Sequence, residues 1–219
     1  MSEDRATQLA AIAAEIHECT ACRLCKEAKN AVPGYGDPNA DILFIGEAPG
    51  REEDRQGLPF VGRSGKYLDY LLGLIGMSRE QVFITNVVKH RPPENRDPQT
   101  DEIITCKSFL DRQFDIIDPL VVATLGRFSM ARYFPDSKIS RIHGQPRYGE
   151  NRAYYPFYHP AAALRNPRLR HDMEADIHRL VEVVEEMKLR RAHQTSDHAE
   201  EDPPKNDDDE GTPEQLTLF

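Results

Sequence analysis

Apolar runs typical of buried strands alternate along this chain with segments whose apolar residues recur at helical spacing, and this alternation most constrains the fold. The predicted strands are residues 41–46, 82–88, 120–125 and 154–158. The predicted helices are residues 9–16, 64–76, 100–118 and 167–188. Strands separated by helices pair in parallel with helices on both faces. The sequence therefore predicts an α/β protein, a three-layer α/β/α sandwich around a central four-stranded parallel sheet.

The net charge of −9 is concentrated at one end of the 219 residues. Residues 191–219 hold nine acidic side chains against two basic ones, whereas residues 1–190 hold 28 acidic and 26 basic ones. A segment this acidic, with few apolar residues, cannot bury a core. We therefore predict one folded domain over 1–190, an acidic disordered linker over 191–214 and a terminal peptide over 215–219.

The apolar runs are too short for a membrane protein. The longest uncharged apolar runs, such as residues 119–126, span about eight residues, against the roughly 20 that a membrane helix needs. The N-terminus is acidic and polar, where a secretory signal would be basic and then apolar. We expect a cytoplasmic protein without a membrane partner.

Polar residues follow the predicted strands at the edge where parallel sheets bind ligands. Glu47, Asn86 and His159 each come directly after or at the end of an apolar run. Ala48 and Gly50, which flank the first of these ends, are small enough to let backbone N–H groups approach a ligand. The sequence thus predicts a polar binding site along one edge of the sheet.

Four sequence blocks in a fixed order carry a specific resemblance. They are Gly46-Glu47-Ala48-Pro49-Gly50 with Glu53-Asp54, Gly57-Leu58-Pro59-Phe60-Val61-Gly62, Thr85-Asn86-Val87-Val88-Lys89, and His159-Pro160-Ala161-Ala162-Ala163-Leu164-Arg165. Over residues 5–190 the chain resembles the family 4 uracil-DNA glycosylases, the thermostable iron–sulfur group. The resemblance implies a monofunctional enzyme of base excision repair that acts as a monomer. Such an enzyme flips uracil out of DNA, hydrolyses its N-glycosidic bond and leaves an abasic site.

The resemblance also implies two catalytic residues. Glu47 corresponds to the acidic residue that orients water or stabilises the cationic sugar. His159 corresponds to the histidine that faces uracil O2, where a donor stabilises the negative charge that develops as the bond breaks.

Four further residues are expected to bind uracil. Phe60 matches the aromatic residue that stacks on the flipped ring, although an arbitrary Phe is more often a core residue. Asn86 matches the residue that pairs with O4 and N3–H of the base. Ala48 is expected to bring its backbone close to the base, and Glu53 to crowd the C5 position and exclude thymine.

Residues around this pocket are expected to contact DNA. Arg63 and Ser64 are candidates for phosphate contacts, and Leu164 and Arg165 resemble the wedge that fills the space left by a flipped nucleotide. The basic segment with Arg141, His143 and Arg147 is expected near DNA as well. The expected contacts are Arg63, Ser64, Arg141, His143, Leu164 and Arg165.

Four cysteines suggest a metal site rather than disulfides. Cys19, Cys22 and Cys106 match three ligands of the family's [4Fe-4S] cluster, but the family's remaining cysteine position is occupied here by His90. The fourth ligand is then His90 by position or Cys25 by chemistry, and we favour His90. Zinc is the alternative, because three cysteines and a histidine also satisfy a tetrahedral site.

The last five residues, Gln215-Leu216-Thr217-Leu218-Phe219, resemble the peptide by which bacterial repair and replication proteins bind the sliding clamp. The side chains expected to bind the clamp are those of Gln215, Leu216, Leu218 and Phe219. An extended apolar end on an unfolded tether suits such docking.

Three rival functions remain at this stage. A non-catalytic iron–sulfur protein could bind DNA or carry electrons, but it would not need three polar groups converging on one base. A relative that traps uracil-DNA covalently uses a histidine in an inserted loop. Here residues 91–96 contain no insert, and Ala48 stands where that relative has a glutamine. A nucleotide hydrolase would need a Walker pattern, which this sequence lacks.

Overall fold

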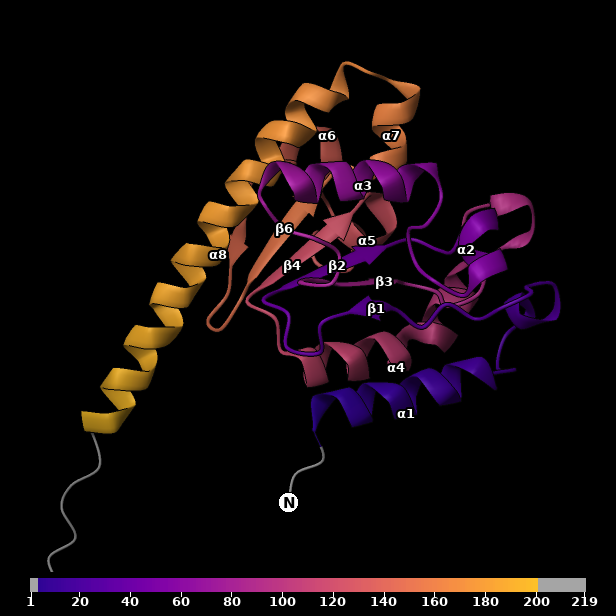
Figure 1. Cartoon of the computed structure of the whole chain (residues 1–219), viewed down its shortest axis with the longest axis horizontal. Coiled ribbons are helices and arrows are strands. Elements are labelled where there is room, and N and C mark those ends of the chain that lie inside the picture. Colours follow the sequence, from indigo (N-terminus) through magenta and orange to yellow (C-terminus); the bar gives the residue numbers. More distant parts are fainter. Residues whose placement is uncertain (1–3, 201–219) are drawn as a thin grey trace, which may run out of the picture.

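A six-stranded sheet forms the centre of the computed structural model, which describes residues 4–200 (Figure 1). The strands follow the order β1-β3-β2-β4-β6-β5 across the sheet. They are β1 (Tyr35–Gly36), β2 (Ile42–Gly46), β3 (Phe83–Asn86), β4 (Val121–Leu125), β5 (Arg147–Tyr148) and β6 (Ala153–Phe157).

The four central strands β3, β2, β4 and β6 pair in parallel. They are the four strands that the sequence predicts, so the predicted α/β fold with its parallel core is confirmed. The sheet as a whole is mixed, however, because β1 and β5 pair antiparallel at its two edges. These edge strands were not predicted, since two residues are too few to show a strand pattern.

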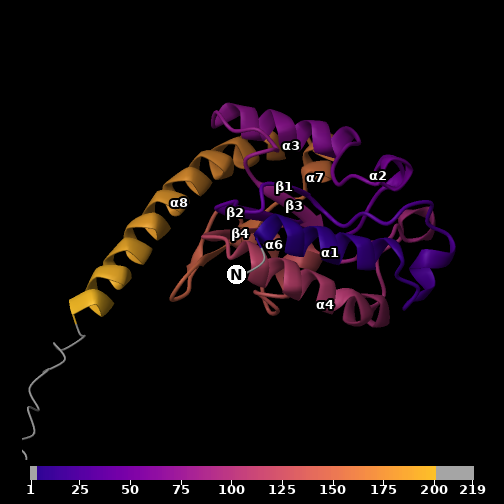
Figure 2. The same cartoon turned by 60° about the horizontal axis from the view of Figure 1, so that its bottom comes forward.

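Helices cover both faces of the sheet, as Figures 1 and 2 show. On one face α1 and α4 lie side by side, and on the other α3 and α7 pack with α8. The α-helices are α1 (Arg5–His17), α2 (Arg51–Gln56), α3 (Arg63–Leu74), α4 (Thr100–Ile117), α5 (Arg127–Ala131), α6 (Ile139–Ile142), α7 (Pro160–Arg165) and α8 (Leu169–Glu200). Two 3₁₀ helices are η1 (Arg23–Lys26) and η2 (Pro93–Asn95).

Burial explains why the central strands read as continuous apolar runs. All five residues of β2 and all five of β4 are buried. Helices cover both faces of these strands, and neither face can then carry a solvated side chain. One apolar core lies between the sheet and α3, α7 and α8, and a second lies between the sheet and α1 and α4.

The predicted start of the linker at residue 191 is wrong, because α8 continues to Glu200. Arg191 also packs against the domain, since its guanidinium donates to the Asp118 carboxylate at 3.2 Å and to the Pro119 carbonyl at 3.2 Å. The sequence contains helix-forming residues and no Gly or Pro between Leu189 and Glu200, so the helix has no local reason to stop at 190. The remaining part of the predicted linker and the terminal peptide lie outside the described residues.

No helix within residues 4–200 is both long and apolar enough to cross a bilayer.

Candidate active site

The carboxyl ends of the parallel strands gather the predicted polar residues. Gly46 at the end of β2 is paired with Asn86 at the end of β3. A Cβ atom on Gly46 would lie 2.3 Å from the Asn86 Oδ1 and 2.7 Å from the Phe60 ring. The Phe60 ring in turn lies 5.7 Å from the His159 ring, measured between centroids. The missing side chain of Gly46 therefore lets residues from three separate sequence blocks approach one another.

Asn86 presents an acceptor without a partner. The residue is 1% exposed, and no hydrogen-bond donor among the described residues reaches its Oδ1. Leaving a buried acceptor unsatisfied costs about 1–3 kcal/mol. A ligand that presents an N–H donor at this strand end would satisfy the acceptor.

Phe60 is held in a backbone conformation that non-glycine residues rarely adopt, with φ of 53°. The Glu53 carboxylate accepts the backbone N–H groups of Val61 at 3.0 Å and Gly62 at 2.8 Å. The Arg79 guanidinium donates to the Pro59 carbonyl at 3.2 Å and to the Phe60 carbonyl at 2.8 Å. These bonds on both sides of Phe60 oppose relaxation of the strained loop, and strain of this kind clusters at binding sites.

His159 is positioned as a neutral donor. It precedes α7, and its Nδ1 accepts the Ala161 backbone N–H at 3.1 Å. The proton of the neutral ring therefore lies on Nε2. Burial, with a smaller contribution from the Arg165 charge, lowers the pKa of His159 to about 4. The imidazole is thus uncharged at neutral pH.

Glu47 lies half-buried among three charges. Burial and the nearby Asp97 raise the pKa of its carboxyl group, while Arg127 and Arg165 oppose that rise. Arg127 also forms an ion pair with Asp97. Sequence analysis missed both Asp97 and Arg127. Arg127 was detectable, because it follows Gly126 immediately after β4, at the same edge of the sheet.

The predicted DNA-contacting residues are mostly accessible within the described chain. The exposed ones are Arg63, Arg141, Leu164 and Arg165, and Ser64 is half-buried in the first turn of α3. Ala48, which is expected to bind uracil, is half-buried beside the second core. Leu164 is 38% exposed.

The basic segment with Arg141 and His143 is divided by the structure. His143 Nδ1 lies 2.8 Å from the Asp176 carboxylate, and its ring stacks on Tyr158, the neighbour of His159. Arg147 instead stacks on Tyr154 near the start of β6, away from the strand end that precedes His159. His143 therefore lies near the carboxyl end of β6, whereas Arg147 lies near its beginning. The fold separates the two residues along the length of β6.

The cysteines gather beside this site. Cys22 and Cys106 pack into the same apolar core, and the Cys106 thiol interacts electrostatically with the thiols of Cys19 and Cys22. Burial raises the pKa of Cys22 and of Cys106. Backbone N–H groups of Leu24 and Lys89 donate to the two sulfur atoms, which favours the thiolate form.

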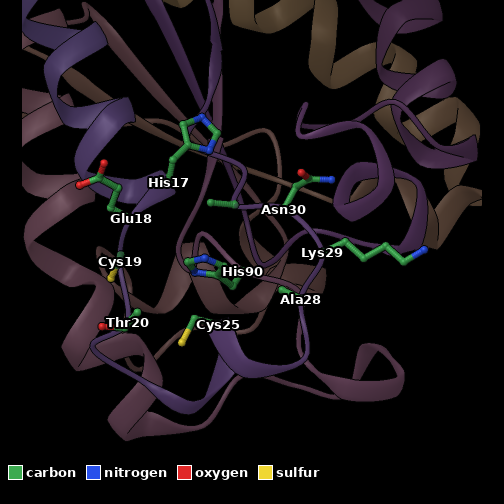
Figure 3. Close-up of a pocket in the computed structure, with 10 residues that line it drawn as sticks. His17, Glu18, Cys19, Thr20, Cys25, Ala28, Lys29, Asn30 and His90 are labelled. Atoms are coloured by element: carbon green, nitrogen blue, oxygen red, sulfur yellow. The ribbon is translucent and has the colours of Figure 1, made fainter.

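Both candidates for a fourth ligand face one cavity of about 180 Å³. Cys19, Cys25 and His90 line it together (Figure 3). Within residues 4–200 no three potential ligands are gathered as a single metal ion would require.

Comparison with known proteins agrees with this geometry. The sequence pattern of the uracil DNA glycosylase superfamily matches residues 33–183. A type-4 uracil-DNA glycosylase of Sulfurisphaera tokodaii is 47% identical over 180 residues, which cover 78% of this chain and 82% of the relative. Those of Saccharolobus solfataricus and Archaeoglobus fulgidus are 46% and 44% identical, covering 85% and 91% of each relative. This chain belongs to the type-4 uracil-DNA glycosylase family.

Membership of the glycosylase family confirms the resemblance drawn from the four sequence blocks. The matched segment contains Glu47, Phe60, Asn86 and His159, whereas the first three cysteines precede it. The individual roles of these residues stay predictions.

We predict that Gly46→Ala inactivates this glycosylase. The added methyl group would collide with Asn86 Oδ1 and the Phe60 ring, and displacing such groups by about 1 Å is expected to cost about 10²-fold in rate. Single-turnover cleavage of uracil-containing DNA measures the loss. Gly73→Ala is the matched control, because nothing lies within 4 Å of a Cβ there and the change should leave the rate unaltered. A fully active Gly46→Ala enzyme would contradict the proposed packing.

We also predict an acid-sensitive contribution of His159 to stability. Its folded pKa is depressed from 6.5 to about 4, so the neutral ring stabilises the fold above pH 6.5. This stability is lost as the pH falls from about 6.5 through 4. Urea denaturation at pH 7.5 and pH 4.5 should show a smaller loss on acidification for His159→Gln than for the original chain. Equal losses would mean that the ring titrates normally.

Proposed function

We propose that this protein is a uracil-DNA glycosylase that flips uracil from DNA and hydrolyses the bond between its N1 and the deoxyribose C1′. The product is an abasic site, as in the first step of base excision repair. The unpartnered, buried Oδ1 of Asn86 beside Phe60 and His159, in a chain of the type-4 family, is the observation that supports this function best.

Base recognition would depend on Asn86. Its Oδ1 accepts N3–H of uracil and its Nδ2 donates to O4, whereas cytosine presents the opposite pattern at both atoms. A buried amide paired with the wrong base would leave polar groups unsatisfied, which gives strong discrimination. Phe60 stacks on the ring, and this contact offsets part of the few kcal/mol that flipping costs.

Glu53 would exclude thymine by fixing the loop that carries Phe60 as well as by direct contact. Its carboxylate already accepts the N–H groups of Val61 and Gly62, so it fixes the position of Phe60 and thereby the space beside the base. The backbone at Ala48 borders the same space from the end of β2.

Cleavage would proceed with the electron pair of the C1′–N1 bond leaving on uracil. The Nε2–H of His159 donates to O2, where negative charge develops, and a donor of this kind contributes about 10²- to 10³-fold to the rate. The Glu47 carboxylate stabilises the cationic sugar and orients the water whose oxygen adds to C1′. That water loses a proton to the carboxylate, and the released uracil anion later takes a proton from solvent.

DNA would lie across the exposed residues around the pocket. Arg63 and Ser64 at the start of α3 and the Arg141–His143 segment bind phosphates. Leu164 and Arg165 enter the space that the flipped nucleotide leaves. The chain acts as a cytoplasmic monomer in this proposal, as the sequence predicts.

Release of free uracil from a duplex with one U·G mismatch tests this function. We expect the original chain to release uracil and to spare a T·G mismatch, and Asn86→Ala to lose at least 10²-fold in rate because the base-pairing amide is gone. Separation of the reaction on a denaturing gel distinguishes the rivals. Absence of uracil release would support a non-catalytic DNA-binding protein, and a stable protein–DNA adduct would support the covalent trap.

We further propose that Cys19, Cys22, Cys106 and His90 hold a [4Fe-4S] cluster. The convergence of three thiols and the cavity lined by His90 support this ligand set. The bound cluster would serve as a structural link between the loop after α1 and the loop after β3. Cys25 remains the alternative fourth ligand, because it lines the same cavity.

Iron analysis of two variants separates these ligands. His90→Ala should lose bound iron and the brown absorbance, because this change removes a ligand of the cluster. Cys25→Ser should retain about four iron atoms per chain, because in this proposal Cys25 is not a ligand. The opposite result would assign Cys25. A colourless protein with one zinc ion would overturn the cluster.

We propose that the acidic segment tethers a clamp-binding peptide, with Gln215, Leu216, Leu218 and Phe219 as its contacts. These residues lie outside the described structure, and the proposal rests on their sequence. The folded domain in this proposal extends through α8.

Deleting residues 215–219 should abolish co-elution with a bacterial sliding clamp and leave cleavage of short oligonucleotides unchanged, since the peptide is far in sequence from the site. Co-elution that survives the deletion would remove the clamp from the proposal.

A further inference from the structure

Lys89 is a fully buried amine that the proposed chemistry does not use. It lies three residues after β3 and is 1% exposed. Its Nζ donates to Thr85 Oγ1 at 2.6 Å, to Gln113 Oε1 at 2.7 Å and to the Asn86 carbonyl at 3.0 Å. Three acceptors match the three N–H groups of an ammonium, so the side chain is fully bonded in this place.

These acceptors place Lys89 directly behind the base-reading residue. Thr85 and Asn86 form the end of β3, and the Asn86 carbonyl belongs to the residue whose side chain points at the pocket. A bond to this carbonyl restrains the peptide plane of Asn86 and hence the direction of its side chain. Without it, the Asn86 peptide would keep the ladder with β2 but would lose the restraint on its carbonyl.

A second layer of bonds fixes Lys89 in turn. Gln113 of α4 donates from Nε2 to the Pro33 carbonyl at 2.9 Å, and Thr85 donates from its hydroxyl to the same carbonyl at 2.8 Å. The backbone of Lys89 accepts the Val32 N–H at 2.8 Å. The strand end, α4 and the loop before β1 are therefore joined at one side chain.

The surroundings of Lys89 are unusual for a buried lysine. Among residues 4–200 no carboxylate forms an ion pair with it, although a buried ammonium normally needs a negative partner. The group of negative character beside it is the Cys106 thiol, whose sulfur accepts the Lys89 backbone N–H. An apolar side chain would fill this buried position without any polar group to satisfy, so the three bonded acceptors indicate a role that requires the N–H groups of Lys89.

We propose that Lys89 is a positioning residue for uracil recognition, which holds Asn86 in the orientation that pairs with the base. The inference rests on the proposed function, since it concerns how the same pocket selects uracil. Lys89 acts through Asn86 and does not contact the substrate.

The test is inhibition by free uracil of iron-loaded enzyme. The inhibition constant is measured on the fraction of molecules that is active, so it does not change when a variant merely unfolds more. Lys89→Met keeps the length of the side chain and removes its donors, and we expect about a tenfold increase in the constant. Thr85→Val removes one acceptor of the same network and should give a smaller increase. If Lys89→Met does not fold, the inhibition constant of Thr85→Val tests the inference.

Tyr155→Phe is the matched control. Its hydroxyl is buried and donates to the Asp176 carbonyl at 2.7 Å, a bond that has no connection to Asn86. We expect this variant to melt at a lower temperature with an unchanged inhibition constant.

The inference is overturned if Lys89→Met and Thr85→Val bind uracil as tightly as the original chain, or if Tyr155→Phe weakens binding equally. Failure of the proposed function is recognised separately, because the original chain would then release no uracil from DNA.

Discussion

The parallel pairing of β2 with β3 is the constraint on which the site depends. It puts Gly46 opposite Asn86, where any larger residue would occupy the space in which the Asn86 amide and the Phe60 ring meet. Both strands are buried, so their register is set by the apolar residues that precede these positions. The base recognition that we propose for this point would therefore be built into the core of the fold rather than added on a flexible loop.

The loop around Phe60 shows how local strain is maintained. A positive φ at a bulky residue is unfavourable, yet the Arg79 guanidinium bonds the Pro59 carbonyl before Phe60 and the Glu53 carboxylate bonds the Gly62 N–H after it. The result is a rigid aromatic platform. A rigid platform loses little entropy when a base stacks on it, which suits a site that must offset the cost of flipping.

The cysteine region and the base-reading region are neighbouring parts of one polar network. Cys106 and Gln113 lie on the same helix, α4, and Lys89 contacts both of them while bonding Asn86. A group bound at the cysteines would therefore stabilise the loop that follows the base-reading strand. This arrangement gives a physical reason for the structural role that we propose for the cluster in an enzyme whose reaction transfers no electrons.

Much of this protein was determined by the sequence alone. The apolar runs fixed the parallel core, and the polar residues at the strand ends identified Glu47, Asn86 and His159, because the side-chain period and the carboxyl-end rule are local properties. The edge strands β1 and β5 and the continuation of α8 past residue 190 were not predicted. The first are too short to show a pattern, and the second lies in a segment whose charge suggested disorder although its residues favour a helix.

The tertiary structure alone decided the bracing role of Glu53, the charges of Asp97 and Arg127 beside Glu47, and the bonds of Lys89. Each depends on groups that are distant in sequence and meet only when the chain is packed, and no local pattern encodes such meetings.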